Sequence, residues 1–224
     1  MTTLLFSDTH LSNRVYRKKY SYLKKIIERH DRVIILGDLW DGFLTSFDGF
    51  VTSGWKELFP LLLEKQALYF YGNHDREEWS DERVTLFSVA QYHELDIEIS
   101  GFKLHLMHGH AGVFVSLDER LHVQNHSLPL RIGASLDMLH KLVWGKRFLS
   151  SDSSINEPIK LWRAQHVRNN ALVVTGHSHF PEKSLEEGIL NPGFIGCGFG
   201  NYLSITEGRI ELVKERYWKQ YKDV

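Results

Sequence analysis

The stretch Ala67-Leu68-Tyr69-Phe70-Tyr71-Gly72-Asn73-His74-Asp75 places a polar tetrad directly after an apolar run. An apolar run of this length that ends at a glycine is typical of a buried strand, so we expect the tetrad in the loop at the strand's carboxyl end. Open α/β sheets bind their ligands at that position. Asn73 offers a carbonyl oxygen, His74 a group that transfers protons near neutral pH, and Asp75 a carboxylate that can orient the imidazole. On its own, the tetrad is also typical of an ordinary turn.

The same arrangement recurs four more times along the chain. Four further apolar, strand-like runs end in clusters of Asp and His: residues 3–6 before Ser7-Asp8-Thr9-His10, residues 32–36 before Gly37-Asp38-Leu39-Trp40-Asp41, residues 103–107 before His108-Gly109-His110, and residues 171–175 before Gly176-His177-Ser178-His179. Folding of a hydrophobic core does not require Asp and His at the end of every buried strand. A metal site built on one edge of a sheet does require such ligands. The five clusters therefore predict a metal site.

Composition sets the broad class of the chain. With 224 residues and 42% hydrophobic content, it can bury a large core, and we expect a single domain over residues 1–224. The formal charge of -1 argues against a protein that coats nucleic acid. The single cysteine, Cys197, excludes an intramolecular disulfide, and the first residues lack the features of a signal peptide. These features predict a cytoplasmic location.

A basic helix is expected soon after the first cluster. Tyr16, Tyr20, Leu23 and Ile27 recur at helical spacing. Residues 14–32 contain eight Lys or Arg against two acidic residues, a local charge of +6. This basic face is either simply solvated or, beginning at Arg14, able to reach an anionic substrate.

Other segments carry weaker local signals. Helices are predicted over residues 55–66, with a kink or boundary at Pro60, and over residues 83–93. Residues 202–206 and 209–213 predict a hairpin joined through Glu207-Gly208.

Residues 111–170 lack a clear strand and are predicted to form a helical insertion. Apolar residues at helical spacing between 132 and 143, and Pro158 in the first turn of a second helix that runs to Val167, support this prediction. The apolar stripe either packs on the core or forms a cap over the site. Residues 121–168 carry seven Lys or Arg against three acidic residues, and they include Trp144 and Phe148 beyond the stripe. We expect these two aromatic side chains to contact a substrate or membrane surface with anionic heads and acyl chains.

The five clusters, in this order over residues 8–179, resemble the five motifs of the calcineurin-like metallophosphoesterases. The resemblance implies an α/β fold, a four-layer α-β-β-α sandwich of two mixed sheets. It also implies two divalent metal ions that share Asp38. The implied ligands are Asp8, His10, Asp38 and His179 for one ion, and Asp38, Asn73, His108 and His177 for the other.

Such a site would hydrolyse a phosphodiester or pyrophosphate bond. Two divalent cations can share and activate a hydroxide near neutral pH and hold the phosphoryl oxygens during in-line attack. Mixed oxygen and imidazole ligands suit Mn²⁺, our first expectation, and also Fe or Zn²⁺. We expect His74 to protonate the leaving oxygen with Asp75 as its orienting partner, and Asp41 and His110 to support the ligands from behind.

Within this family, the chain is most similar to the branch that contains UDP-2,3-diacylglucosamine pyrophosphatase of lipid A biosynthesis. The similarity rests on the insertion, the chain length and the first two motifs. It implies a UDP-diacylglucosamine-like lipid substrate, met at the inner face of the membrane. The chain departs from this branch at His74, where the lipid A enzymes carry Arg, and at Asp41, where they carry Glu.

Alternative functions remain open. A nuclease would use the basic segment with Tyr16, Tyr20 and Tyr22 as stacking partners, so nucleic acid stays a candidate partner. A general phosphomonoesterase would use the same metal ligands. A non-catalytic scaffold is disfavoured because every implied ligand and His74 are present.

Overall fold

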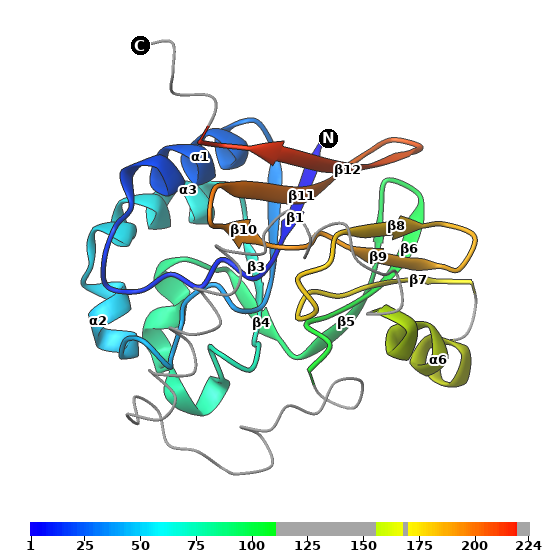
Figure 1. The fold of residues 1–224 in the computed structure, drawn as a ribbon, viewed down its shortest axis with the longest axis horizontal. Coiled ribbons are helices and arrows are strands. Elements are labelled where there is room, and N and C mark those ends of the chain that lie inside the picture. The colour runs from blue at the N-terminus through cyan, green and yellow to red at the C-terminus, as the bar shows by residue number, and fades with distance from the viewer. Residues whose placement is uncertain (111–155, 168–169, 219–224) are drawn as a thin grey trace.

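Two mixed β-sheets lie at the centre of the molecule, with helices on their outer faces (Figure 1). The computed structural model describes residues 1–110, 156–167 and 170–218. Within these ranges the layers follow the order helix, sheet, sheet, helix, because separate cores lie under the helices, between the sheets and under α6. The predicted α-β-β-α fold class is confirmed.

The first sheet is parallel in the middle and antiparallel on one side. Its strand order is β10-β11-β1-β2-β3-β4, and β12 also pairs with β11. Strands β1 to β4 run parallel, whereas β11 is antiparallel to β1, β10 and β12. The strands are β1 (Thr3–Phe6), β2 (Arg32–Leu36), β3 (Leu68–Phe70), β4 (Ala90–Tyr92), β10 (Ile195–Gly196), β11 (Phe199–Thr206) and β12 (Arg209–Arg216).

The second sheet has the order β5-β6-β7-β9-β8. Its three middle strands run parallel and its two edge strands antiparallel. The strands are β5 (Glu94–Ile99), β6 (Phe102–Met107), β7 (Leu172–Val174), β8 (Glu182–Ser184) and β9 (Ile189–Asn191).

The helices cover the outer faces of the sheets. α1, α2, α3 and η1 contribute to the core on the first sheet, and α6 packs on the second sheet through Ile159 and Trp162. The helices are α1 (Arg17–Glu28), α2 (Phe47–Val51), α3 (Phe59–Glu64) and α6 (Glu157–His166), and the 3-10 helices are η1 (Gly54–Leu58), η2 (Glu77–Trp79) and η3 (Glu82–Leu86).

The apolar strands of the first sheet are buried on both faces. In β2, Val33 and Ile35 belong to the core beneath the helices, while Ile34 and Leu36 belong to the core between the sheets. Alternate side chains of a strand point to opposite faces, so a strand between two cores must be apolar throughout. This explains why the runs in the sequence show no alternation.

The five apolar runs divide between the two sheets. β1, β2 and β3 belong to the first sheet, and β6 and β7 to the second. The expectation of a site on one edge of a single sheet was therefore wrong. The loops that follow the parallel strands of the two sheets meet each other, as the bond from His177 N to Asp8 Oδ2 and that from His108 Nδ1 to the Leu36 carbonyl show.

Most local predictions agree with the structure. The basic helix is α1, and the hairpin is β11–β12, with Thr206 opposite Arg209. The helix predicted to run to Val167 is α6. Residues 55–66 form η1 followed by α3, with Pro60 in the first turn of α3.

The prediction of a helix over residues 83–93 was wrong. This segment contains η3 and then β4, which pairs with β3 as a parallel edge strand. At the start of the segment, the Arg83 guanidinium donates to the carboxylates of Asp81 and Asp48. Sheet pairing thus outweighs the weak helical preference of the sequence.

The predicted insertion and the presence of membrane-spanning helices can be assessed only for the residues that the structure describes. The insertion before residue 156, with Trp144 and Phe148, lies outside the described residues. None of the described helices is long and apolar enough to cross a lipid bilayer.

Candidate metal centre

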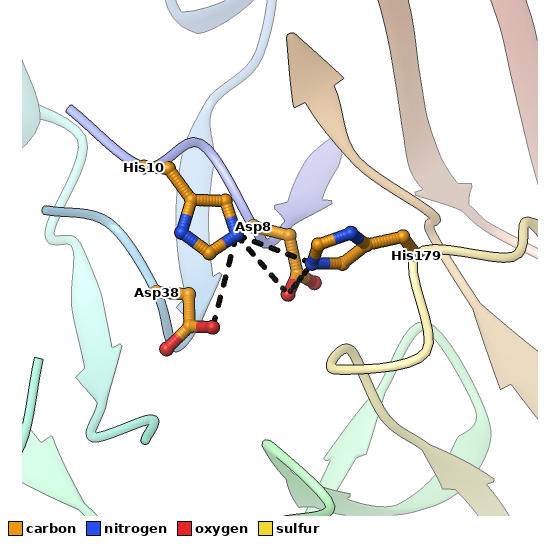
Figure 2. A group of neighbouring side chains, drawn as sticks. All are labelled: Asp8, His10, Asp38 and His179. Carbon is orange, nitrogen blue, oxygen red and sulfur yellow. Dashed lines mark hydrogen bonds and ion pairs between the residues drawn. The ribbon is translucent and has the colours of Figure 1, made fainter. Parts of the chain in front are cut away.

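Four predicted ligands gather at the ends of β1, β2 and β7 (Figure 2). His179 Nε2 lies 3.0 Å from Asp8 Oδ1 and 3.1 Å from His10 Nε2. His10 Nε2 lies 3.9 Å from Asp38 Oδ2. Asp8 and Asp38 are almost fully buried, so these donor atoms face one another away from bulk water.

The other predicted ligands form a second group beside the first. Asn73 Oδ1 lies 2.8 Å from His177 Nδ1 and 3.2 Å from His108 Nε2. His108 Nε2 is also 3.4 Å from Asp38 Oδ2. Asp38 Oδ2 therefore lies between the two groups.

Backbone contacts orient these side chains. His108 Nδ1 donates to the Leu36 carbonyl at 2.7 Å, which turns Nε2 towards Asn73 and Asp38. Asp38 Oδ1 accepts from His74 N at 2.9 Å, which leaves Oδ2 directed at the imidazoles. The ring tautomer and the carboxylate rotamer are thus fixed before any ion binds.

The donor set fits divalent cations. Atoms that bind one ion at about 2.0–2.2 Å lie about 3 to 4 Å from each other. The separations within the two groups run from 2.8 to 4.0 Å. Burial raises the pKa of Asp8 and Asp38, but His179 beside Asp8 and His108 beside Asp38 outweigh burial, so both pKa values are lowered. The carboxylates therefore stay anionic and require positive charge close by, which cations would supply.

The imidazoles divide into two protonation states. Burial opposes protonation of His108, yet Asp38 raises the pKa of its imidazole to about 10. Burial and then the charge of His108 lower the pKa of His177 to about 3. The same causes lower the pKa of His110 to about 3, and its ring centre lies 5.3 Å from that of His108. The neutral imidazole is the form that binds metal.

The backbone at the predicted ligands is unusual. Nine non-glycine residues of the described ranges have a left-handed φ, and five of these are predicted ligands: Asp8 (φ 53), His10 (φ 45), Asp38 (φ 54), His177 (φ 63) and His179 (φ 59). Such conformations cost on the order of 1 kcal/mol or more each and cluster at functional sites. The loops are therefore shaped by the site and not by local preference.

Two glycines make room for the buried carboxylates. A Cβ on Gly72 would overlap Asp38 Oδ1 and approach Asp38 N to 2.7 Å, and one on Gly176 would approach Asp8 Oδ2 to 2.6 Å. The polar clusters after β3 and β7 must therefore begin with glycine.

The predicted role of Asp75 needs correction. Asp75 does not face His74: its Oδ1 accepts from Gly72 N and Asp38 N, and its Oδ2 accepts from Leu39 N. Its carboxylate, whose pKa is raised to about 7 by burial and by Asp38, therefore holds the loops after β2 and β3 together. The carboxylate beside His74 belongs to Asp41.

Asp41 contacts two imidazoles. Its Oδ1 lies 3.2 Å from His74 Nδ1, and its Oδ2 lies 3.7 Å from His10 Nδ1. The His74 ring is held between Phe43, with ring centres 4.1 Å apart, and His10, at 4.5 Å. Asp41 can thus fix the tautomer of the predicted acid, His74.

A hydrogen-bond network behind the last loop was missed by sequence reasoning. Asn156 Oδ1 accepts from Ser178 Oγ at 2.7 Å, and Ser178 Oγ accepts from Asn191 Nδ2 at 3.0 Å. Asn156 is fully buried next to α6, so the chain before α6 is tied to the residue between His177 and His179. Nothing in the sequence around Asn156 marks it as part of the site.

Arg14 lies on the exposed surface, and its backbone N–H donates to Ser12 Oγ at 3.2 Å. The side chains of α1 that line a cavity beside the metal centre are instead those of Arg17, Lys18 and Lys19. A substrate contact by Arg14 remains a prediction.

Comparison with known proteins gives a family and a fold. The model of the calcineurin-like phosphoesterase superfamily domain matches residues 1–201. Vps29 of Entamoeba histolytica, complexed with Zn²⁺, is a similar solved structure with a TM-score of 0.50 and 16% identity, over 97% of this chain and 99% of that chain. Yfce, a phosphoesterase from E. coli, is another similar solved structure, with a TM-score of 0.51 and 16% identity over 95% of this chain and 92% of that chain. At such identities the likeness shows the fold alone. No curated protein sequence gives a match.

We expect Gly72→Ala to weaken metal binding at least about tenfold, as displaced supporting contacts do at metal sites. The added methyl group must push Asp38 from its place between the two groups. Titration with Mn²⁺ or Zn²⁺, followed by calorimetry, measures the effect. Gly196→Ala is the matched control, because a Cβ there meets nothing closer than 3.4 Å. Equal metal affinity in the two variants would contradict the packing argument.

Proposed function

The chain belongs to the calcineurin-like phosphoesterase superfamily, and on that premise we propose that it is a dinuclear-metal-dependent hydrolase of a phosphodiester or pyrophosphate bond. The observation that carries the proposal is the position of Asp38 Oδ2 between the two ligand groups, 3.9 Å from His10 Nε2 and 3.4 Å from His108 Nε2. One buried carboxylate oxygen shared by two donor sets is suited to bridge two cations.

The residues that would hold the cations are the two groups described above. Asp8, His10 and His179 would complete one site with Asp38, and Asn73, His108 and His177 would complete the other. When bound, a pair of divalent cations supplies Lewis acidity that activates water and neutralises charge on the phosphoryl oxygens. Oxygen and imidazole donors favour Mn²⁺ as our first choice, with Fe and Zn²⁺ also compatible.

His74 is proposed as the general acid. In the reaction, the oxygen of a water molecule bonds to phosphorus and one proton of that water passes to solvent. The bond from phosphorus to the leaving oxygen breaks, and the leaving oxygen takes a proton from His74, which regains one from solvent. With Nδ1 turned to Asp41, Nε2 is the ring nitrogen that remains to deliver a proton, and His74 lines the cavity beside the metal centre. Phe43 and His10 keep the ring in this orientation.

A lipid diphosphate, of the UDP-diacylglucosamine type, is the finer proposal for the substrate, and contact with the inner face of a membrane would follow from it. It rests on the basic, apolar-rich sequence of residues 121–168 and on the resemblance to the pyrophosphatase branch. We do not propose a nuclease. Of the tyrosines suggested as stacking partners, Tyr22 is buried against Tyr217, and only Tyr16 is largely exposed.

We expect Asp38→Ala to abolish hydrolysis and to lower bound metal in the same preparation, because both ligand groups lose their shared oxygen. Elemental analysis of folded protein with metal in excess, together with hydrolysis of a panel of mono-, di- and pyrophosphate esters, makes the measurement. Wild-type protein that binds no transition metal under these conditions would rule out the proposed function.

His74→Ala should keep its metal and lose about 10² to 10⁴ in turnover, the usual range for a missing general acid. The loss should be greatest with poor leaving groups, since these depend most on protonation. His93→Ala is the matched control, an exposed imidazole paired with Glu77. If His74→Ala hydrolysed a substrate with a poor leaving group at the wild-type rate, His74 would not be the general acid.

Acylated diphosphates should be cleaved with higher kcat/KM than their unacylated counterparts, since each buried methylene contributes about 0.8 kcal/mol. Trp144→Ala and Phe148→Ala should narrow this difference, whereas Leu86→Ala, at an exposed leucine in η3, should not. Equal kcat/KM for acylated and unacylated substrates would indicate that the insertion only packs on the core and does not contact an acyl chain.

A further inference from the structure

A cavity of about 580 Å³ lies beside the candidate metal centre. Asp8, His10 and His74 line it on the side of the metal ligands. Its other walls come from the start of α1, from β10 and from Tyr217 and Trp218, which follow β12. Among the described residues, none from the segment 121–168, on which the lipid proposal rests, lines the cavity.

Contacts between the walls keep the cavity in shape. The buried ammonium of Lys19 donates to the Thr9 carbonyl, which ties α1 to the loop that carries Asp8 and His10. One turn further along the same face of α1, Tyr22 stacks on Tyr217, with ring centres 5.0 Å apart. Because the walls are held by the site's own loop, a ligand in the cavity has a fixed position relative to the metal ligands.

Aromatic side chains form much of the lining. Trp55 and Phe194 are buried, whereas Tyr16 and Trp218 expose 54% and 47% of their surface. Large exposed rings next to a cavity are typical of sites that bind flat apolar groups, because stacking covers both surfaces. The leucines of the lining, Leu11 and Leu44, extend this apolar surface.

Two exposed basic side chains line the cavity together with the aromatic rings. Arg17 and Lys18 line the cavity, are exposed, and form no ion pair with an acidic side chain of the described residues. Lysine and arginine beside aromatic rings suit a ligand that joins an aromatic ring to an anionic group, such as a phosphate. A plain acyl chain would leave both charges unused.

We propose that this cavity binds the leaving half of the substrate, and that this half carries an aromatic ring joined to an anionic group. The assignment to the leaving half rests on the proposed function, because His74, which would protonate the leaving oxygen, lines the cavity. Trp218 and Tyr16 are assigned to the ring, and Arg17 and Lys18 to the anion.

The single cysteine allows a binding test that needs no hydrolysis. Cys197 lines the cavity and is partly buried, so a bound ligand should slow its alkylation by iodoacetamide. The probes are adenosine 5′-monophosphate, ribose 5-phosphate, which lacks the ring, and decyl phosphate, which replaces it with a chain. We expect the nucleotide to protect at concentrations about tenfold lower than ribose 5-phosphate, as stacking of one base predicts.

Variants separate the two parts of the site. Trp218→Ala should remove the advantage of the nucleotide over ribose 5-phosphate, and the double variant Arg17→Ala/Lys18→Ala should weaken protection by both. Lys24→Ala/Lys25→Ala, with the same charge change on the same helix, should leave protection unchanged. Each comparison uses the alkylation rate of one variant with and without probe, so altered thiol reactivity cancels.

The outcomes distinguish this inference from the proposed function. Equal protection by nucleotide and ribose 5-phosphate, or strongest protection by decyl phosphate, overturns the inference even if the protein hydrolyses phosphate esters. Ring-dependent protection that Trp218→Ala removes supports the ring site. If the wild type showed this protection but bound no metal and hydrolysed nothing, the ring site would stand, while the proposed function and the assignment to the leaving half would fall.

Discussion

The constraint on which the structure depends is the burial of two carboxylates, Asp8 and Asp38, where the ends of the two sheets meet. Both are almost completely excluded from solvent, and the charge of Asp38 raises the cost of ionising Asp8. Buried anions are tolerated only when charge and hydrogen bonds compensate them. The imidazoles around them, the backbone N–H groups of His74 and His177, and the space left by glycines supply that compensation. A pair of divalent cations would satisfy the same demand more completely, which is why the donor set fits them.

The two-sheet architecture follows from the same demand. One sheet edge offers loops along a single row, whereas two facing sheets bring loops to the site from both sides. The first sheet supplies Asp8, His10, Asp38 and Asn73, and the second supplies His108, His177 and His179. All three oxygen donors thus come from the first sheet, and three of the four imidazoles come from the second. Packing of the core between the sheets sets the distance between the two kinds of donor.

The strands and most of the predicted ligands could be identified from the sequence, because strands buried on both faces are continuous apolar runs and the Asp, Asn and His residues follow each run directly. Contacts between segments that are distant in the sequence could not be predicted. The sequence places Asp75 next to His74, yet successive side chains in the loop diverge, and the carboxylate beside His74 comes from Asp41, which lies 33 positions away. Pairing of β4 with β3, the role of Asn156 and the ring-lined cavity likewise depend on tertiary contacts that leave no local pattern.

The left-handed backbone at Asp8, His10, Asp38, His177 and His179 bears on how this chain can change over evolution. At such positions glycine relieves strain, so replacing a ligand by glycine would recover on the order of 1 kcal/mol locally. Drift without selection for the chemistry would therefore erase the ligands early, since their loss stabilises the loops that carry them. Keeping all five side chains against this gradient would require selection for what they bind. Stability and chemistry pull in opposite directions at these five positions, as expected of a working site.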